Sequence, residues 1–508
     1  MEPAPTPRPA EPDEGAVDLR LVAALLALTL AAYFNSLPNG FAWDDTYVLV
    51  KNGAVQSLAH PARFFTDPST CATKPEMVSY RPLRTLTWAL VHEVAGLDPL
   101  AYHLVNVSFH LGSVGLLCAL LPALRVPTGP ALLVAGLFGV HPIQTEAVAS
   151  VTGLTDVMSG FFYLASLLGF VRAVSGRRRA ASFALCWLSF AGALASKEMA
   201  LSLPLVAALV AVRLGAPGQR RRRGVLLVAV LALTALGWMA LRFRLMGRLG
   251  YDADLPGGTV GRTALMQAEA LAAYVRLLLF PSGLSVRHVI DVPLSAAEPR
   301  VVLSLLVVAG LVAWLVLSVR RRADEALGLA WFWLTLIPVM NVIPLPGDLM
   351  GERFLYLPMI GFALAVVTVA GRWLASAPPA LARWAAGLAL VALATATAAR
   401  NRDWKDDLTL FESAVRVSPT SNVVRFGLAG AYARSGRAEE AAAQLEAVRR
   451  NARAYSERYV ALGDGARDRQ DGDEARLWYV RALRASPGDP VARKRLAELG
   501  AGPGLPAR

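Results

Sequence analysis

The chain has 508 residues, 55% of them hydrophobic, and a mean hydropathy of +0.44. Repeated apolar runs of about 20 residues exclude an ordinary soluble protein and predict a polytopic membrane protein. The formal charge of +13 comes from short arginine clusters between apolar runs, without the interleaved aromatic residues that stack on bases, so no nucleic acid is expected among its partners.

The N-terminal segment 1–19 is rich in Pro, Glu and Ala and has no basic stretch before an apolar core. It predicts a disordered cytoplasmic tail and not a cleaved signal peptide. The first apolar run, 20–37, is long enough to cross a bilayer. The stretch NGFAWDDTYVLVKN (39–52) follows it and places the adjacent acids Asp44 and Asp45 beside the membrane. On its own, this acid pair is equally well explained as part of a solvated loop.

Ten further apolar runs complete a predicted all-α membrane domain of about eleven spans over 20–400. They are 100–122, 130–150, 154–174, 180–196, 199–215, 224–243, 301–319, 328–345, 354–371 and 382–400. Two amphipathic or interrupted segments, 81–97 and 264–281, are expected to lie along the membrane or to re-enter it.

Three basic clusters, Arg177–Arg179, Arg220–Arg223 and Arg320–Arg322, test this topology. With the N-terminus inside and one crossing per run, all three are cytoplasmic, as the positive-inside rule requires. The same parity puts the acid pair, the loops 38–99 and 244–300, and everything after residue 400 outside.

The polar C-terminal region, 401–508, has a 34-residue period that brings Leu428 into register with Leu462. The segments 421–454 and 455–488 each predict a helix–turn–helix with small and apolar residues at tetratricopeptide positions. The alternative is a generic amphipathic helical bundle. A repeat stack of this kind binds peptides or proteins and carries no chemistry of its own.

His141, Glu146 and Asp156 lie near the outer boundary of a predicted span. The five-residue spacing of His141 and Glu146 does not suit a helical zinc pair, so no metal site is predicted. Their plain interpretation is a polar patch at a helix end. The three cysteines, Cys71, Cys118 and Cys186, have no metal spacing, and we expect no disulfide framework.

Two further charged pairs, Lys197 with Glu198 and Glu352 with Arg353, also fall at predicted outer boundaries. A snorkelling lysine and a capped helix would explain them without function. The planar fork of an arginine such as Arg353 can also hold a phosphate.

Arg242 and Arg244 end a predicted span on its outer side, against the positive-inside rule. Binding of a phosphate by one or both is one interpretation, and mere tolerance of outer charge is the other. No Walker loop, dinucleotide fingerprint or Ser-His-Asp pattern is present to suggest other chemistry.

The chain resembles the transmembrane O-mannosyltransferases that carry tetratricopeptide repeats (TMTC-type proteins), and a bacterial relative in particular. HPIQTEAVA and ERFLYLP are the most specific of the shared stretches, which span nearly the whole chain in the family's order. They are NGFAWDDTYVLVKN (39–52), RPLRTLTWAL (81–90), YHLVNVSFH (102–110), LFGVHPIQTEAVASVTGLTD (137–156), SKEMALSLP (196–204), YVRLLLFPSGL (274–284), ERFLYLPMIGFAL (352–364) and RNRDWKDDLTLFESAVRVSP (400–419).

The resemblance implies a GT-C glycosyltransferase fold with a catalytic acid in the first outer loop. It implies transfer of a sugar, mannose above all, from a membrane polyprenyl-phosphate donor to an acceptor hydroxyl, with the repeats holding a protein acceptor or partner. The expected base is Asp44 or Asp45. The expected phosphate-binding cations are Lys197, Arg353, Arg242 and Arg244, and the expected pocket residues are His141, Glu146, Asp156, Glu198 and Glu352. The resemblance leaves open whether a divalent metal takes part.

One departure concerns Leu154, where the family has an arginine two residues before the retained Asp156. If that arginine binds the donor phosphate in relatives, another cation must serve here, or the donor has changed, or activity has been lost. The alternative function is a membrane-anchored scaffold without catalysis, and a lipid-sugar flippase is a third possibility. The arginine-rich, lysine-poor composition suggests a bacterial inner membrane, with the site on the periplasmic or extracellular side.

Overall fold

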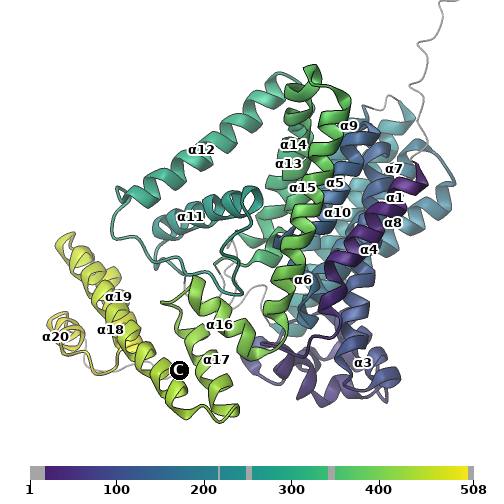
Figure 1. Ribbon diagram of the computed structural model, residues 1–508. Coiled ribbons are helices and arrows are strands. Elements are labelled where there is room, and N and C mark those ends of the chain that lie inside the picture. The colour runs from purple at the N-terminus through teal and green to yellow at the C-terminus, as the bar shows by residue number, and fades with distance from the viewer. Residues whose placement is uncertain (1–17, 216–217, 248–254, 341–348, 501–508) are drawn as a thin grey trace, which may run out of the picture.

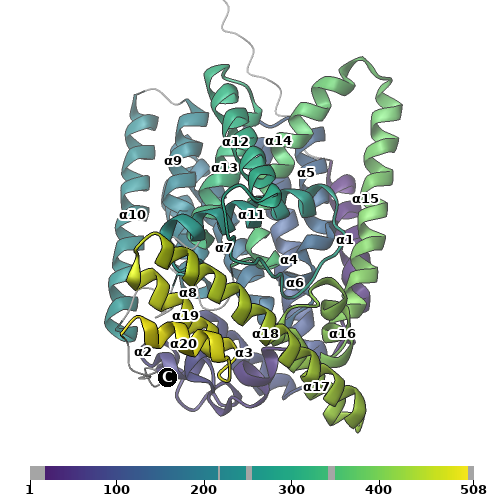
Figure 2. The same ribbon diagram turned by 90° about the vertical axis from the view of Figure 1, so that its left-hand side faces the viewer.

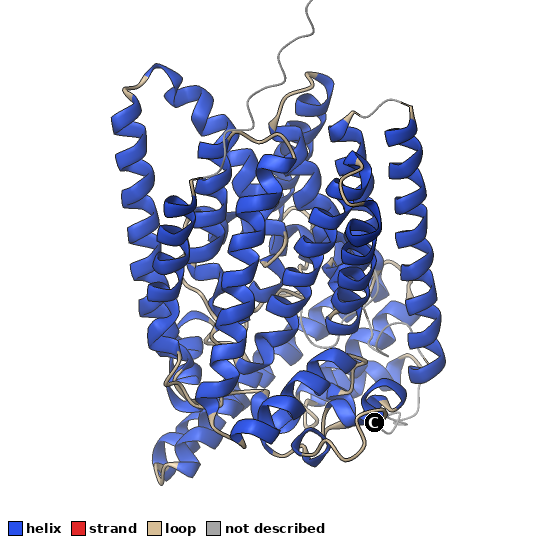
Figure 3. Ribbon diagram, turned by 90° about the vertical axis from the view of Figure 1, so that its right-hand side faces the viewer, coloured by secondary structure: helices blue, strands red, loops and turns tan. Residues whose placement is uncertain are grey.

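In the computed structural model, residues 18–215, 218–247, 255–340 and 349–500 are described. All regular structure in these ranges is helical, with no strand among them, so the predicted all-α class is confirmed for this part of the chain (Figure 3). Most of the N-terminal tail expected at 1–19 lies outside the described residues.

The described α-helices divide between the membrane domain and the C-terminal region. Those of the membrane domain are α1 Leu19–Tyr33, α2 Arg63–Thr66, α3 Pro82–Ala95, α4 Pro99–Ala123, α5 Thr128–Val140, α6 Thr145–Val148, α7 Leu154–Ser175, α8 Arg179–Ser196, α9 Leu203–Leu214, α10 Gln219–Met246, α11 Val260–Leu279, α12 Pro299–Arg320, α13 Glu325–Leu336, α14 Pro358–Trp373 and α15 Pro379–Asn401. Those of the C-terminal region are α16 Asp407–Val417, α17 Asn422–Arg434, α18 Ala438–Asp468, α19 Gly472–Ala485 and α20 Pro490–Glu498.

A helix occupies all or part of each of the eleven predicted runs, but the helices differ in length, and residues 341–345 of the run 328–345 lie outside the described residues. Within the described ranges, eight are long and apolar enough to cross a membrane, namely α1, α4, α7, α8, α10, α12, α14 and α15. The bent pair of α5 with the turn and helix 142–148, at 50°, would make a ninth. α9 and α13 have 12 residues each, and at 1.5 Å per residue they are about 18 Å long, less than a bilayer core. The count of eleven spans therefore stays a prediction.

The two ends of the bundle are chemically different. The start of α10 and the end of α12, where the clusters Arg220–Arg223 and Arg320–Arg322 occur, lie at the end drawn uppermost in Figure 2. The C-terminal helices lie at the opposite end, together with α3 (Figures 1 and 2). This separation of basic loops from the C-terminal region agrees with the sidedness that the sequence predicts.

α7 lies at the centre of the bundle, because 83% of its 18-residue apolar stretch is buried, whereas the corresponding share is 11% for α15 at the edge. Small residues allow its neighbours to approach closely. A Cβ atom on Gly169 would lie 2.6 Å from the backbone nitrogen of Cys186 on α8. Gly328 and Gly361 permit the same close contact between α13 and α14. Helices within a membrane associate through close van der Waals packing of this kind, because the hydrophobic effect does not drive them together there.

The turns predicted within 421–454 and 455–488 are present at 435–437 and 469–471, and the tetratricopeptide assignment stays a prediction. The expected break between the units is absent, because α18 runs through it as one helix of 31 residues. Pro419 and Pro487 follow the ends of α16 and α19, whereas Arg453 stands midway between them at the same 34-residue spacing. Proline stops a helix and arginine does not, which explains the continuous helix.

The C-terminal helices pack against the membrane domain through an irregular connecting segment, 281–298, between α11 and α12. The Arg458 side chain donates to the carbonyl of Val292 at 2.6 Å, and the Ser418 hydroxyl donates to the carbonyl of Arg287 at 2.6 Å. These contacts make the C-terminal region a wall of the membrane domain's polar end.

Candidate functional site

A cavity of about 740 Å³ lies at the end of the bundle nearest the C-terminal helices. Its walls come from the first loop, α3, the starts and ends of several membrane helices, the connecting segment and α17. Seven of the residues expected from the sequence line it, namely Asp44, Glu146, Asp156, Lys197, Glu198, Arg242 and Arg353. Segments far apart in the sequence thus contribute their polar groups to one space.

Interrupted helices explain why polar groups gather there. Short 3₁₀ turns at 142–144, 151–153, 198–202 and 352–355 separate or precede the apolar helices around the cavity. Backbone that leaves the helical hydrogen-bond pattern at membrane depth is tolerated only where protein buries it or where it faces a water-filled space. The short α5 and α9 end or begin at these turns, so the cavity reaches inward from the end of the bundle.

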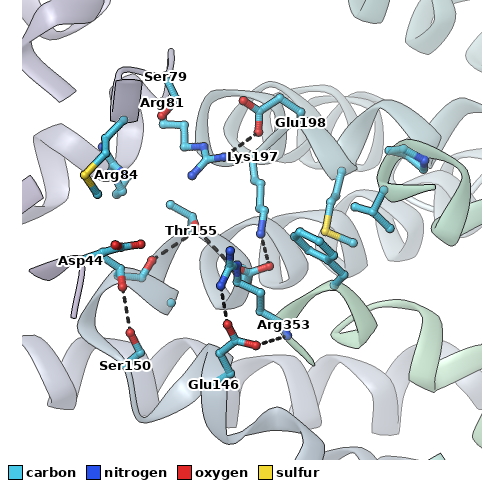
Figure 4. Close-up of a pocket in the computed structure, with 18 of the residues that line it drawn as sticks. Asp44, Ser79, Arg81, Arg84, Glu146, Ser150, Thr155, Lys197, Glu198 and Arg353 are labelled. Atoms are coloured by element: carbon cyan, nitrogen blue, oxygen red, sulfur yellow. Dashed lines mark hydrogen bonds and ion pairs between the residues drawn. The ribbon is translucent and has the colours of Figure 1, made fainter. Parts of the chain in front are cut away.

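Asp44 and Asp45 have different surroundings. The Asp45 side chain is buried and accepts the backbone N–H groups of Ala42 at 3.0 Å and Thr152 at 2.9 Å. Burial raises the pKa of Asp45 to about 7. Asp44 is half-buried and extends into the cavity (Figure 4). Of the two acids, only Asp44 is therefore placed to meet a ligand.

Two ion pairs cross the floor of the cavity (Figure 4). Lys197 Nζ lies 2.5 Å from Asp156 Oδ1, and both side chains are almost fully buried. The backbone N–H of Arg353 donates to Glu146 Oε2 at 2.8 Å, and its guanidinium pairs with the same carboxylate. Burial lowers the pKa of Lys197, but Asp156 favours its charged form.

Glu198 bridges two arginines at the rim. Its carboxylate lies 3.1 Å from Arg81 and 2.8 Å from Arg242. Burial alone would raise the pKa of Glu198, but Arg81 and Arg242 outweigh it and hold that pKa well below its usual range. Glu198 thus fixes two cations of the cavity lining in place.

Arg81 and Arg84 are cavity residues that the sequence analysis did not single out. Arg81 immediately precedes α3 as its N-cap residue, and Arg84 lies in the first turn of that helix. The available signal was their place in the RPLRTLTWAL stretch. Counting Lys74 and Arg287, seven cationic and five acidic side chains among the described residues line the cavity, which gives this part of its lining a formal surplus of two positive charges.

Four predicted site residues do not line the cavity. His141 begins the turn after α5, where its ring accepts from the N–H of Ile143 and lies 3.2 Å from the carbonyl oxygen of Leu278. Glu352 is fully buried and holds the connecting segment through His288, at 2.8 Å, and a backbone N–H. Arg244 is exposed, two residues beyond Arg242, and Asp45 is the fourth.

One side of the cavity is apolar and faces outward between α9, α10 and α13. Leu205 and Ile337 are 49% and 44% exposed there, and Trp238 is a further lining residue. Exposed apolar side chains on membrane helices contact lipid. We call Leu205, Trp238 and Ile337 the apolar mouth. The apolar mouth belongs to the same cavity as the charged groups.

Leu154, which departs from the family pattern, is 1% exposed and packs in the apolar core of the bundle. Its neighbours Gly153, Thr155 and Asp156 line the cavity instead. No group of three or more His, Cys, Asp or Glu side chains arranged to hold a metal occurs in the described ranges. The three cysteines are free and buried.

No family model matches the chain. It is 39% identical over 185 residues to "Protein O-mannosyl-transferase tmtc2" of Xenopus laevis, covering 35% of this chain and 22% of that protein. It is 25% identical over 443 residues to human "Protein O-mannosyl-transferase TMTC3", covering 79% and 48% of the two chains. It is 27% identical over 527 residues to "Protein O-mannosyl-transferase Tmtc1" of Drosophila melanogaster, covering 84% and 60%.

The chain thus spans about half the length of the curated relatives that it matches over most of its own length. The three relatives named above share the printed name "Protein O-mannosyl-transferase". The homologues of this chain are proteins of the TMTC family.

Proposed function

We propose that this protein is a membrane-embedded GT-C-type glycosyltransferase that moves mannose from a polyprenyl-phosphate donor to a hydroxyl group on a protein. The observation that carries this proposal is one cavity with the Asp44 carboxylate and a surplus of cations at its polar end and an apolar mouth facing lipid. A polyprenyl-phosphate sugar matches this arrangement, because its sugar and phosphate are polar and its long isoprenoid chain is apolar. The relatives' name, protein O-mannosyl-transferase, supports mannose as the sugar and a protein as the acceptor.

In the proposed reaction, Asp44 accepts the proton of the acceptor hydroxyl while the hydroxyl oxygen attacks the anomeric carbon. The new carbon–oxygen bond forms as the bond from that carbon to the phosphate oxygen breaks, so the configuration inverts. The electron pair of the broken bond leaves with the polyprenyl phosphate. General-base assistance of this kind contributes about 10²–10⁴-fold to rate.

The cations would stabilise the departing phosphate. The carboxylate of Glu198 holds Arg81 and Arg242 beside the cavity. Lys197 and Arg353 each have a carboxylate partner and contribute field at the floor of the cavity. Preorganised positive charge aimed at a developing negative charge is a large source of catalysis. Leu154 stands where the family has an arginine, but these other cations would still be present to bind the donor phosphate.

The surroundings favour a reaction outside the cytoplasm. The arginine clusters adjoin the end of the bundle opposite the cavity, and such clusters mark the cytoplasmic side. In a bacterial plasma membrane the cavity would then open to the periplasmic or extracellular space. The C-terminal helices, which contribute Val423 to its wall, would contact the protein acceptor there.

The test is turnover of the purified full-length protein with radiolabelled polyprenyl-phosphate mannose and glucose, beside Asp44→Asn. Transfer or donor hydrolysis with the mannose donor, lost in Asp44→Asn while the variant stays folded, would support the proposal. A wild-type protein that neither turns over nor is thermally stabilised by either donor would contradict it and favour the non-catalytic scaffold.

A further inference from the structure

Trp43, immediately before the candidate base, has an unusual backbone. Its φ of +58° lies in the left-handed region, although it is not glycine. A bulky side chain in that region costs roughly 1–3 kcal/mol and persists only where the surroundings hold it. The contacts of Trp43 therefore show what keeps this loop in shape.

Those contacts come from the C-terminal region. The backbone N–H of Trp43 donates to Asp407 Oδ1 at 2.7 Å, and its ring packs on Phe411, with centroids 5.2 Å apart. Asp407 and Phe411 are both on α16. Nearby, the N–H of Gly40 donates to the carbonyl of Lys405 at 2.8 Å. The first loop is thus fastened to the segment that leads into the repeat-like helices.

On the other side of the base, Asp45 is fastened to the membrane domain through the N–H of Thr152, at 2.9 Å. Asp44 therefore lies between two anchored neighbours that belong to different parts of the protein. Its backbone has little freedom, and its carboxylate extends into the cavity (Figure 4), whose lining also includes Trp43.

The role of Asp407 differs from that of its neighbour Asp406. Asp406 caps α16 by accepting the N–H of Thr409 at 2.9 Å, so the helix does not need Asp407 for its start. The second oxygen of Asp407 pairs with Arg434, whose side chain is 63% exposed. An exposed pair of this kind is worth about 0–1 kcal/mol. The other contact of Asp407 is the hydrogen bond that it accepts from the backbone N–H of Trp43.

We propose that Asp407 is a positioning residue for catalysis: by holding the left-handed Trp43, it aims the Asp44 carboxylate into the cavity. This inference rests on the function proposed above. It makes the C-terminal helices part of the catalytic assembly and not only a surface for partners. Misplacement of a catalytic group by about 1 Å can lower a rate about 10²-fold.

The experiment uses the full chain in lipid nanodiscs and compares Asp407→Ala with Asp407→Asn. Asparagine keeps an oxygen that can accept the Trp43 N–H, whereas alanine does not. Asp473→Ala is the matched control, because Asp473 is an exposed acid in the first turn of α19, away from the cavity. Hydrogen–deuterium exchange of the peptide that contains Trp43–Asp45 and the kinetics of mannosyl transfer are both measured.

We expect Asp407→Ala to exchange faster in that peptide and to lower kcat by about 10- to 100-fold with little change in donor KM. We expect Asp407→Asn to restore slow exchange and most of kcat, and Asp473→Ala to match the wild type. Unchanged exchange in Asp407→Ala, or an asparagine variant as impaired as the alanine variant, would overturn the proposal. If the wild type has no transferase activity, the proposed function fails, and the exchange data still decide whether Asp407 holds the loop.

Discussion

Asp44 and Asp45 are adjacent in the chain, yet only the Asp44 carboxylate lines the cavity, while Asp45 binds two backbone N–H groups beneath it. The two acids that the sequence presents as equivalent therefore have separate tasks. Asp44 is placed for chemistry, and Asp45 ties the first loop to the turn at 151–153. This division leads to different expectations for the two variants.

We expect Asp45→Asn to change how stability depends on pH. The pKa of Asp45 is about 7 in the folded protein and near 4 when exposed. Between these values the folded state keeps a proton that the unfolded state releases, so the wild-type protein loses stability as pH rises from about 4 to about 7. Asparagine cannot titrate, so this contribution disappears in the variant.

The measurement is the apparent Tm of wild type and Asp45→Asn in one detergent at pH 4.5, 6 and 7.5. The difference between the two proteins should change with pH in favour of the variant at higher pH. The exposed Asp473→Asn serves as the control for loss of a carboxylate. A wild type and Asp45→Asn pair whose Tm difference is independent of pH would refute this role for Asp45.

A second prediction concerns the buried pair of Lys197 and Asp156. Removing one charge leaves the other buried without its partner, and loss of one member of such a pair costs about 3–5 kcal/mol. We therefore expect Lys197→Met to lower the Tm strongly. The double variant Lys197→Met/Asp156→Leu should recover much of the Tm, because both charges are gone, but it should not recover transferase activity.

Thermal unfolding of the wild type, both single variants and the double variant forms a double-mutant cycle that isolates the coupling between the two side chains. Additive losses of stability would show that the pair is not coupled. Restored activity in the double variant would show that Lys197 has no part in binding the donor.

The third prediction compares Arg242 with Arg244, two arginines of the same helix. Arg242 is 7% exposed at the cavity rim, whereas Arg244 points to the exterior. We expect Arg242→Gln to raise the KM for the donor about 10-fold, because a hydrogen bond to a charged group is worth about 1.5–3 kcal/mol. Arg244→Gln should leave KM within about two-fold of the wild type. Equal effects of the two substitutions would mean that general surface charge, and not the cavity rim, attracts the donor.

Much of the site was predictable, because polar groups that interrupt apolar runs are costly at membrane depth unless they have a task. Glu146, Asp156, Lys197 and Arg353 were found in this way, and they meet in one cavity. The same reasoning also selected Glu352, whose task is to bind the connecting segment. Sequence pattern indicates that a polar group is held at such a boundary, but only the tertiary structure shows which way it faces.

Sequence reasoning missed two cavity residues because they lie in a segment where charged side chains are common. Arg81 and Arg84 belong to an amphipathic helix outside the predicted spans, where a charged face usually meets water. The continuity of α18 was missed for another reason, since a 34-residue period fixes the register of the units but not whether the chain breaks between them. That detail depends on the single residue Arg453.

The last prediction tests the apolar mouth as the path of the donor's lipid chain. Leu205 lies on α9 at the mouth, so tryptophan there should narrow the gap between α9, α10 and α13. A long isoprenoid must pass through this gap to place its phosphate beside Arg81 and Arg242, whereas a donor with one or two isoprene units need not fill it. We therefore expect Leu205→Trp to lower kcat/KM at least about 10-fold with a long-chain donor, the effect of losing about 1.4 kcal/mol of binding. The short-chain donor should be affected much less.

Val212→Trp is the matched control, because Val212 is on the same helix and 79% exposed but does not line the cavity. Both variants place an added indole on a lipid-facing part of α9, so a general disturbance of that helix would affect them alike. The argument depends on the ratio of long-chain to short-chain kcat/KM. If Leu205→Trp lowers both donors equally, the substitution has distorted the polar end and the lipid chain takes another route.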